Sequence, residues 1–220
     1  MVHCPIMKVK IKSVKRRNPR QDRSRQMVEW IIEASMRLFS EQGYTATTTN
    51  KIAELAGVSV GSLYHYFPNK DAILLELGIR HRKNMYREII KTLKNDSGFD
   101  LRHVLKEIIA KIIHLHRDNL LFIEALTLHT HIDKLLDSMD HDYDLKFWST
   151  VGNIIKRKYL QPGMDVSLES LRQTWIVLGK TGKDVIHNIA MENSFGPDEK
   201  IIDGLVDAIL TYMYKQPAAP

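Results

Sequence analysis

The sequence has little of several features that would assign it to a specialised class of protein. Its single cysteine, Cys4, excludes an internal disulfide, which fits a reducing compartment. No run of about 18 apolar residues is present, so we expect no membrane-spanning helix. The start, MVHCPIMKVKIKSVKRR, lacks the continuous apolar region of a signal peptide. These absences favour a cytoplasmic location.

Signals of catalysis are equally scarce. The Gly-Lys-Thr string at 179–181 is not a phosphate-binding loop, because the motif's earlier glycine is missing and no strand precedes it. His114 and His116 lie two residues apart, as do His129 and His131, and residues at that spacing face different sides of a helix. Neither pair chelates a metal within one helix, although a site assembled across helices stays open. We therefore expect no cofactor, no metal and no enzymatic activity.

Strand patterns are also missing. No stretch alternates between apolar and polar residues, and no internal repeat is present. Apolar residues instead recur at helical spacing along most of the chain after Asp22. The chain of 220 residues, 44% hydrophobic and 26% charged, is large enough for one large or two small globular domains. We predict an all-α fold of about nine helices.

Positive charge is concentrated at the amino-terminal end. Residues 1–70 hold 12 Lys and Arg against five Asp and Glu, whereas the rest of the chain holds 20 against 21. The formal net charge of +6 therefore belongs to the first third of the chain, as expected for a protein that meets a polyanion. Residues 1–20 contain seven of these cations, two prolines and no acid, and we expect a flexible basic arm. It either lies along DNA phosphates or in a minor groove, or serves only as a solubilising extension.

The stretch from Thr47 to Lys70 predicts a helix-turn-helix over about residues 48–67. Threonine oxygens at 47–49 offer a cap to the first short helix, and Gly57 permits the left-handed residue that ends it. Ser59 offers a cap to the second. Leu63 and Phe67 lie four residues apart and face back onto Ile52 and Ala56. A first helix from about Asp22 to Gln42, ended by Gly43, completes a three-helix head.

The outward face of the second short helix suggests DNA binding. Small residues at its start allow close backbone approach, tyrosine hydroxyls and the Lys70 ammonium suit phosphates, and Val60, Ser62 and His65 suit base edges. The alternative is a helical hairpin whose tyrosines only cover the core. The predicted DNA-binding residues are Thr48, Thr49, Ser59, Val60, Gly61, Ser62, Tyr64, His65, Tyr66 and Lys70.

These residues resemble the TetR family of bacterial one-component repressors over roughly residues 25–85. The family's signature is matched by Leu38-Phe39 through Gly43-Tyr44, Thr48-Thr49 through Ile52-Ala53, Gly57 through Phe67, and Pro68-Asn69-Lys70. The resemblance implies a DNA-binding domain at residues 21–85 and a ligand-binding and dimerisation domain at 86–220. It also implies a homodimeric bacterial repressor, at the nucleoid when bound, that a small-molecule effector releases from a partly palindromic DNA operator.

The rest of the chain reads as helices that form a larger bundle. The segments after the head are about 71–94, 101–119, 120–128, 145–160, 168–192 and 198–214. The last two are apolar over wide faces, and glycines at 179 and 182 suit close approach of another backbone. We expect a four-helix dimer interface, although these helices could instead complete the monomer's core. Its predicted residues are Trp175, Gly179, Gly182, Ile186, Ile202, Leu205 and Ile209.

Polar and aromatic residues that interrupt the apolar faces are candidates for effector binding: His116, Glu124, Trp148, Trp175 and His187. For each of them the alternative is an ordinary core position. Two other readings stay open for the whole chain. One is a DNA-binding protein without an effector that acts structurally or in cell division, and the other is a helical metal-dependent enzyme.

Deletion of residues 1–20 tests the basic arm. We expect the shortened chain to bind all DNA sequences more weakly and with a smaller salt dependence, because cations that touch phosphates release counterions. Titration of DNA at several salt concentrations measures this. An unchanged salt dependence would show that the arm makes no phosphate contacts.

Overall fold

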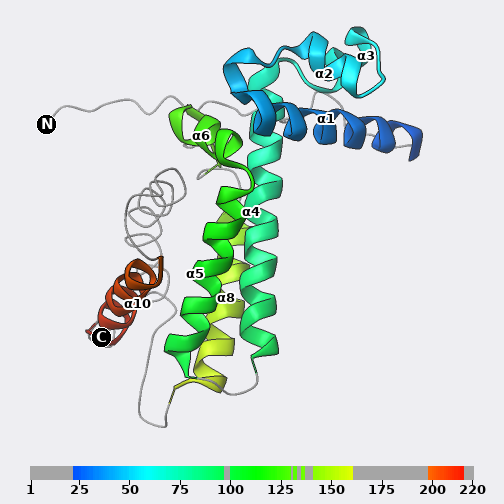
Figure 1. The fold of residues 1–220 in the computed structure, drawn as a ribbon. Helices are drawn as coiled ribbons and strands as arrows, with labels where there is room; N and C mark the ends of the chain where they lie inside the picture. Colours follow the sequence, from blue (N-terminus) through cyan, green and yellow to red (C-terminus); the bar gives the residue numbers. More distant parts are fainter. Residues whose placement is uncertain are drawn as a thin grey trace, which may run out of the picture. The chain divides into compact units, whose positions relative to one another are not determined.

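The computed structural model describes residues 22–96, 100–129, 131–132, 135–136, 141–160 and 198–215, and within these ranges every numbered element is a helix (Figure 1). The predicted all-α class is confirmed. The predicted helix at 168–192 and the arm at 1–20 lie outside the described residues. The helices are α1 (Asp22–Ala46), α2 (Thr49–Leu55), α3 (Val60–Tyr66), α4 (Lys70–Asn95), α5 (Leu101–Arg117), α6 (Leu120–Leu128), α8 (His141–Lys158) and α10 (Asp198–Lys215).

The chain divides into two compact units between Gly78 and Ile79, inside α4. The first unit holds α1, α2, α3 and the start of α4, and the second holds the rest of α4 and the remaining helices. Our functional division at residues 20 and 85 stays a proposal, because packing alone does not say which residues bind DNA or ligand.

The first unit packs its short helices against α1 and the start of α4. Phe39, Ile52 and Leu63 are fully buried, one from each of the first three helices. Phe67 and Ile73 join them from the end of α3 and the start of α4. Burial of such large apolar side chains is the main favourable term in folding, and here it holds two seven-residue helices that would be unstable alone.

The regular part of α1 ends at Gly43, as predicted. Gly43 has φ 76° and ψ 172°, a backbone conformation that side-chain-bearing residues rarely adopt. Thr47 is buried a few residues later, and its hydroxyl donates to the Gly43 carbonyl at 2.7 Å. We call residues 43–48 the α1–α2 junction. This junction turns the chain so that α2 begins at Thr49 with its apolar side on the core.

The core of the second unit lies between α4, α5 and α8. Tyr86 of α4 stacks on Phe147 of α8, with ring centroids 3.9 Å apart and planes within 9°.

At the end of α4 the ammonium of Lys158 donates to three carbonyls, those of Leu93, Lys94 and Asp96, at 2.7–3.1 Å. The last carbonyls of a helix have no intrahelical partner, and here Lys158 of α8 supplies a cap at the end of α4.

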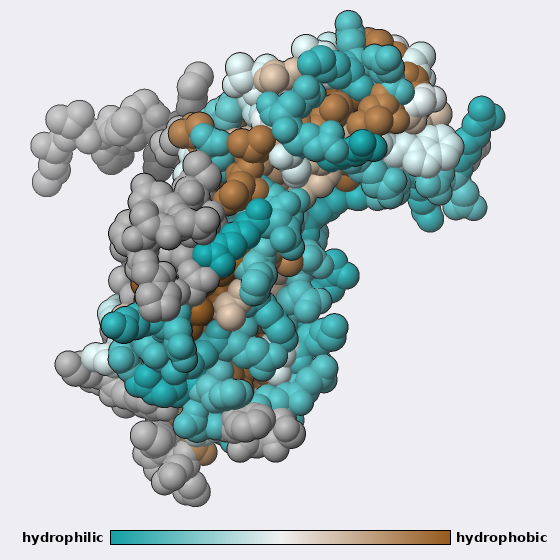
Figure 2. All heavy atoms as spheres, viewed as in Figure 1, coloured by the Kyte–Doolittle hydropathy of each residue, from teal (hydrophilic) through white to brown (hydrophobic). Residues whose placement is uncertain are grey.

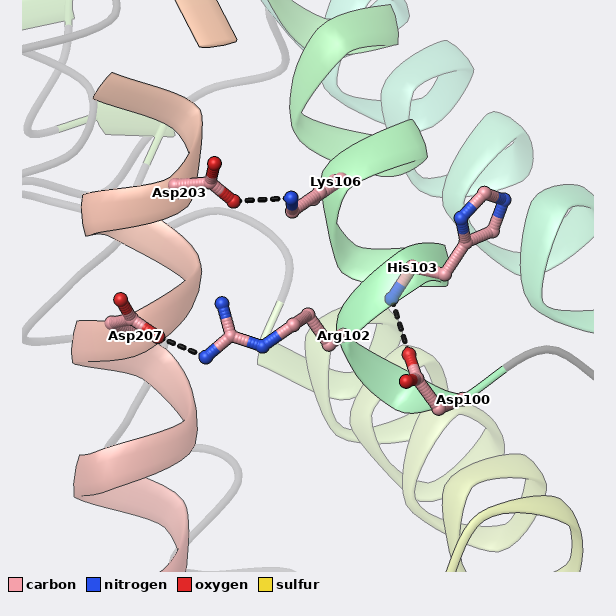
Figure 3. Close-up of polar contacts among 6 residues, drawn as sticks. All are labelled: Asp100, Arg102, His103, Lys106, Asp203 and Asp207. Carbon is pink, nitrogen blue, oxygen red and sulfur yellow. Dashed lines mark hydrogen bonds and ion pairs between the residues drawn. The ribbon is translucent and has the colours of Figure 1, made fainter. Parts of the chain in front are cut away.

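Helix α10 packs along α5 through a small apolar cluster and two ion pairs. Val206 of α10 is fully buried against Ile109 and Ile113 of α5. Beside this cluster Arg102 pairs with Asp207 and Lys106 with Asp203, so that two cations of α5 face two acids of α10 (Figure 3). These pairs lie near the surface and contribute little stability, but they fix the register in which the two helices meet.

A glycine-to-alanine pair tests the backbone constraint at Gly43. An added Cβ meets no atom within 4 Å at Gly43 and makes only an ordinary contact with Ser59 Oγ, at 3.9 Å, at Gly61. We expect Gly43→Ala to lower the free energy of unfolding by about 1–3 kcal/mol, because only its backbone angles are unfavourable for alanine. Gly61→Ala should leave it unchanged or raise it by up to about 1 kcal/mol. Urea denaturation measures both, and equal effects would contradict the assignment.

Candidate nucleic-acid interface

The helix-turn-helix is built by two side-chain caps and one glycine. The Thr48 hydroxyl oxygen accepts a hydrogen bond from Lys51 N at 3.2 Å at the start of α2. Gly57, with φ 66°, has a left-handed backbone conformation, which ends α2. The Ser59 oxygen then accepts from Ser62 N at 3.0 Å and starts α3. The predicted caps and turn are confirmed, and together they set the direction of α3 relative to α2.

One side of α3 is exposed because the other is in the core. Leu63 and Tyr66 are buried, whereas Val60 and Tyr64 are 37% and 40% exposed, and Gly61 and His65 are also exposed. Figure 2 shows apolar surface among hydrophilic surface on the unit that carries this helix. Large apolar side chains left in water within a mostly polar surface often mark a binding surface.

Hydroxyl pairs join this exposed face to its neighbours. The Tyr64 hydroxyl lies 3.0 Å from the Thr49 hydroxyl, which ties α3 to the first residue of α2. The Ser62 hydroxyl lies 2.8 Å from that of Ser59. Four of the predicted DNA-binding residues are thus held in two pairs. Each hydroxyl keeps further hydrogen-bonding capacity for an outside partner, since a hydroxyl both donates and accepts.

Two of the predicted DNA-binding residues have internal roles in the structure. Tyr66 is 6% exposed, and its ring meets His65 edge-on with centroids 5.0 Å apart. The Lys70 ammonium donates to the carbonyls of Tyr44 at 2.6 Å and Thr47 at 2.8 Å. Sequence reasoning treated both as outward-facing. Their contact with DNA stays a prediction, and the geometry favours a structural part for each.

The sequence model of a protein family, described as bacterial regulatory proteins of the tetR family, matches residues 31–77. This stretch runs from α1 through α3 into α4. The chain belongs to the TetR family. A nucleoid occlusion factor, SlmA of Haemophilus ducreyi, is 32% identical over 125 residues, which cover 57% of this chain and 56% of SlmA. With three Bacillus subtilis regulators the match spans only 34%, 23% and 39% of their length.

Solved TetR-family structures share the fold over most of the chain. A regulator from Mesorhizobium loti superposes with a TM-score of 0.62 at 14% identity, covering 87% of this chain and 97% of its own. The Thermus thermophilus repressor FadR, solved in complex with lauroyl-CoA, gives 0.53 at 21% identity, with 87% and 98% covered. At these identities the likeness shows the fold alone.

In this TetR-family chain, the candidate effector residues that the structure describes lie in the second unit. His116 of α5 is buried and its Nδ1 hydrogen-bonds the Ile112 carbonyl at 2.8 Å. Trp148 of α8 is half-buried, with its ring edge-on to Phe147 at 4.7 Å between centroids. Glu124 is half-buried in α6. Trp175 and His187 lie outside the described residues.

Sequence reasoning missed one half-buried histidine beside this group. The His81 ring of α4 meets His116 at 5.6 Å and Phe122 at 5.7 Å between centroids, and its Nε2 is buried with no hydrogen-bond partner among the described residues. Burial, helped by the neighbouring His116, lowers the pKa of His81 to about 4. Arg80, Arg82 and Lys83 flank it in the sequence, and a histidine among cations is more typical of a surface position.

The predicted dimer interface is only partly described. Ile202, Leu205 and Ile209 of α10 are half-buried and pack beside α5, whereas Trp175, Gly179, Gly182 and Ile186 lie outside the described residues. Among described residues no group of three or more His, Cys, Asp or Glu could hold a metal ion. No helix in the described ranges has the length and apolar character to cross a membrane.

His81 should make the stability of the second unit depend on pH. Its pKa is about 4 in the folded chain and about 6.5 when unfolded, so only the unfolded chain takes up this proton as the pH falls below 6.5. Above pH 6.5 both states are neutral at this site. We expect the free energy of unfolding to fall between pH 6.5 and 4, by at most about 3 kcal/mol.

Urea denaturation followed by circular dichroism at several pH values measures this loss. His81→Phe cannot titrate and should flatten the profile in that window. His114→Gln removes an exposed histidine from α5 and should keep the profile of the parent chain. A parent profile that His81→Phe leaves intact would refute the assignment.

Proposed function

We propose that this chain is a sequence-specific DNA-binding transcriptional regulator, acting as a repressor that a small-molecule effector releases. The observation that carries the proposal is the exposed face of α3, held outward by the burial of Leu63 and Tyr66 on its other side. A short helix fixed in this way by a helix-turn-helix is the usual reader of the DNA major groove.

In this proposal one set of residues contacts phosphates and a second set contacts bases. Thr48, Thr49 and Tyr64 lie at the joined ends of α2 and α3 and hold phosphates through their hydroxyls. Val60, Ser62 and His65 contact base edges, and Gly61 lets the backbone of α3 approach them. Hydroxyl contacts to phosphate fix register without reading sequence, so specificity rests on the second set.

We further propose that the chain acts as a homodimer through its carboxy-terminal helices. Ile202, Leu205 and Ile209 are only half-buried against α5, which leaves part of each side chain for a second copy. Two heads related by a two-fold axis reach successive major grooves, about 34–36 Å apart, and this favours a partly palindromic operator. Such a protein would work in the cytoplasm, at the nucleoid when bound.

Two observations support an effector in the second unit. FadR, which shares the fold, is a repressor solved with lauroyl-CoA. In the part of the chain that the structure describes, the buried His81 Nε2 has no hydrogen-bond partner beside His116 and Phe122, and a ligand's polar group gains most at such an unsatisfied atom. We propose His81, His116, Glu124 and Trp148 as effector contacts. The three Bacillus subtilis relatives are named as transcriptional regulators, and we propose no enzymatic activity.

A second candidate function is DNA binding without an effector. The match to SlmA, which is named a nucleoid occlusion factor, extends beyond the helix-turn-helix to more than half of each chain. Selection of bound sequences from random DNA, followed by a screen for compounds that release the protein, separates the two functions. Release by a compound supports the repressor, whereas a chain that no compound releases fits the second function.

Substitutions on α3 test the division between phosphates and bases. Tyr64→Phe removes only the hydroxyl that pairs with Thr49, and we expect it to weaken selected and random DNA alike, by roughly fivefold for one lost hydrogen bond. The double variant Ser62→Ala, His65→Ala should instead change which sequences are selected. Fluorescence anisotropy measures affinities, and repeated selection measures preference.

Gly61→Ala tests whether the backbone of α3 lies close to the DNA, since the added Cβ makes no close contact with the described residues. It should fold like the parent yet bind DNA more weakly, because the added methyl group lies where the helix approaches the groove. If the Ser62 and His65 double variant selects the same sequences as the parent, these two residues do not read the bases.

A further inference from the structure

Lys70, the first residue of α4, closes a contact with the α1–α2 junction. Its ammonium donates to the carbonyls of Tyr44 at 2.6 Å and Thr47 at 2.8 Å, and it lies 3.8 Å from the centroid of the Tyr44 ring. Two of the three N–H donors of the lysine are therefore used inside the protein. The remaining attraction is to the face of an aromatic ring, which itself favours a cation.

Asp71, the next residue, adds a second contact between the start of α4 and Tyr44 of the junction. Asp71 accepts a hydrogen bond from the Tyr44 hydroxyl, so one tyrosine meets both first residues of α4. Burial, followed by this hydrogen bond, raises the pKa of Tyr44. Burial lowers the pKa of Lys70, and Asp71 opposes that shift. We call Tyr44, Lys70 and Asp71 the junction clasp.

The clasp holds the α1–α2 junction, which leads directly into the proposed DNA-contacting residues of α2. Thr47, whose carbonyl Lys70 binds, is buried and also donates its hydroxyl to the Gly43 carbonyl. Thr48 follows as the cap of α2, and Thr49 pairs with Tyr64 of α3. A displacement of the junction would therefore move the residues that start α2 and, through the hydroxyl pair, those of α3.

We propose that Lys70 is a positioning residue for DNA binding, which ties the α1–α2 junction to the first turn of α4 and so places Thr48, Thr49 and Tyr64 on the DNA. This positioning role is the alternative to the phosphate contact that the sequence predicted for Lys70. The inference rests on the proposed DNA-binding function. It implies that the start of α4 and the start of α2 move as one body.

Substitution at Lys70 distinguishes positioning from phosphate contact. Lys70→Met keeps the length of the stem but loses the ammonium, and Lys70→Arg keeps a charge whose planar donors cannot converge on two carbonyls in the same way. If Lys70 positions the junction, both variants bind selected DNA roughly tenfold more weakly. If it contacts a phosphate, Lys70→Arg binds like the parent.

Salt dependence and a matched lysine provide the controls. A lost phosphate contact lowers the slope of log affinity against log salt by about 0.9. Lys51→Met removes one charge near the same junction, where Lys51 donates to the Ala46 carbonyl at 3.0 Å. Because Lys51→Met and Lys70→Met lose the same charge, positioning predicts equal slopes and a larger loss of affinity for Lys70→Met. Tyr44→Phe, with no change of charge, should weaken binding with the parent's slope.

Amide hydrogen exchange of the full chain without DNA gives an independent readout. In Lys70→Met we expect faster exchange confined to residues 44–51, with the body of α1 protected as in the parent. A parent chain that ignores DNA would overturn the proposed function, but leaves this exchange experiment interpretable. Three results would each overturn the positioning role. They are parent-like DNA affinity in Lys70→Arg, a salt slope in Lys70→Met that is lower than in Lys51→Met by a further amount of about 0.9, and unchanged hydrogen exchange at residues 44–51.

Discussion

The burial of one side of α3 is the constraint on which the rest of the first unit depends. Leu63 is fully buried and Ile52 of α2 lies in the same core, so the seven residues of α3 have only one rotation about their axis that satisfies packing. That rotation leaves Val60, Tyr64 and His65 outside. A helix this short has little stability of its own, and its outward face is therefore a product of the core beneath it. The proposed recognition surface is in this sense specified by the buried residues beneath it.

Local chemistry made much of this unit predictable. A threonine before α2, a serine before α3 and a glycine between them each act over a few residues, and each was found where its chemistry required it. The helices of the second unit followed in the same way from the spacing of apolar residues. What these features share is that their partners lie within about one helical turn in the sequence.

Contacts between distant residues were not predictable on the same grounds. Lys70 meets carbonyls 23 and 26 residues earlier, and no local pattern indicates which carbonyls an ammonium will find. His81 lies among arginines and a lysine, neighbours typical of a solvent-exposed position, yet its ring contacts His116 of α5 and Phe122 of α6. Tyr66 differs from Tyr64 by two residues, enough to turn one ring inward and leave the other exposed. In each case packing between elements decided the outcome.

Both ends of α4 are held by an ammonium group bound to backbone carbonyls. Lys70 binds those of residues 44 and 47 at the beginning, and Lys158 binds those of residues 93, 94 and 96 at the end. Short hydrogen bonds of a cation to carbonyl dipoles are screened by dissolved ions far less than separated surface charges are. We therefore expect the attachment of α4 to depend less on salt concentration than DNA binding does, since affinity for DNA falls steeply as salt rises.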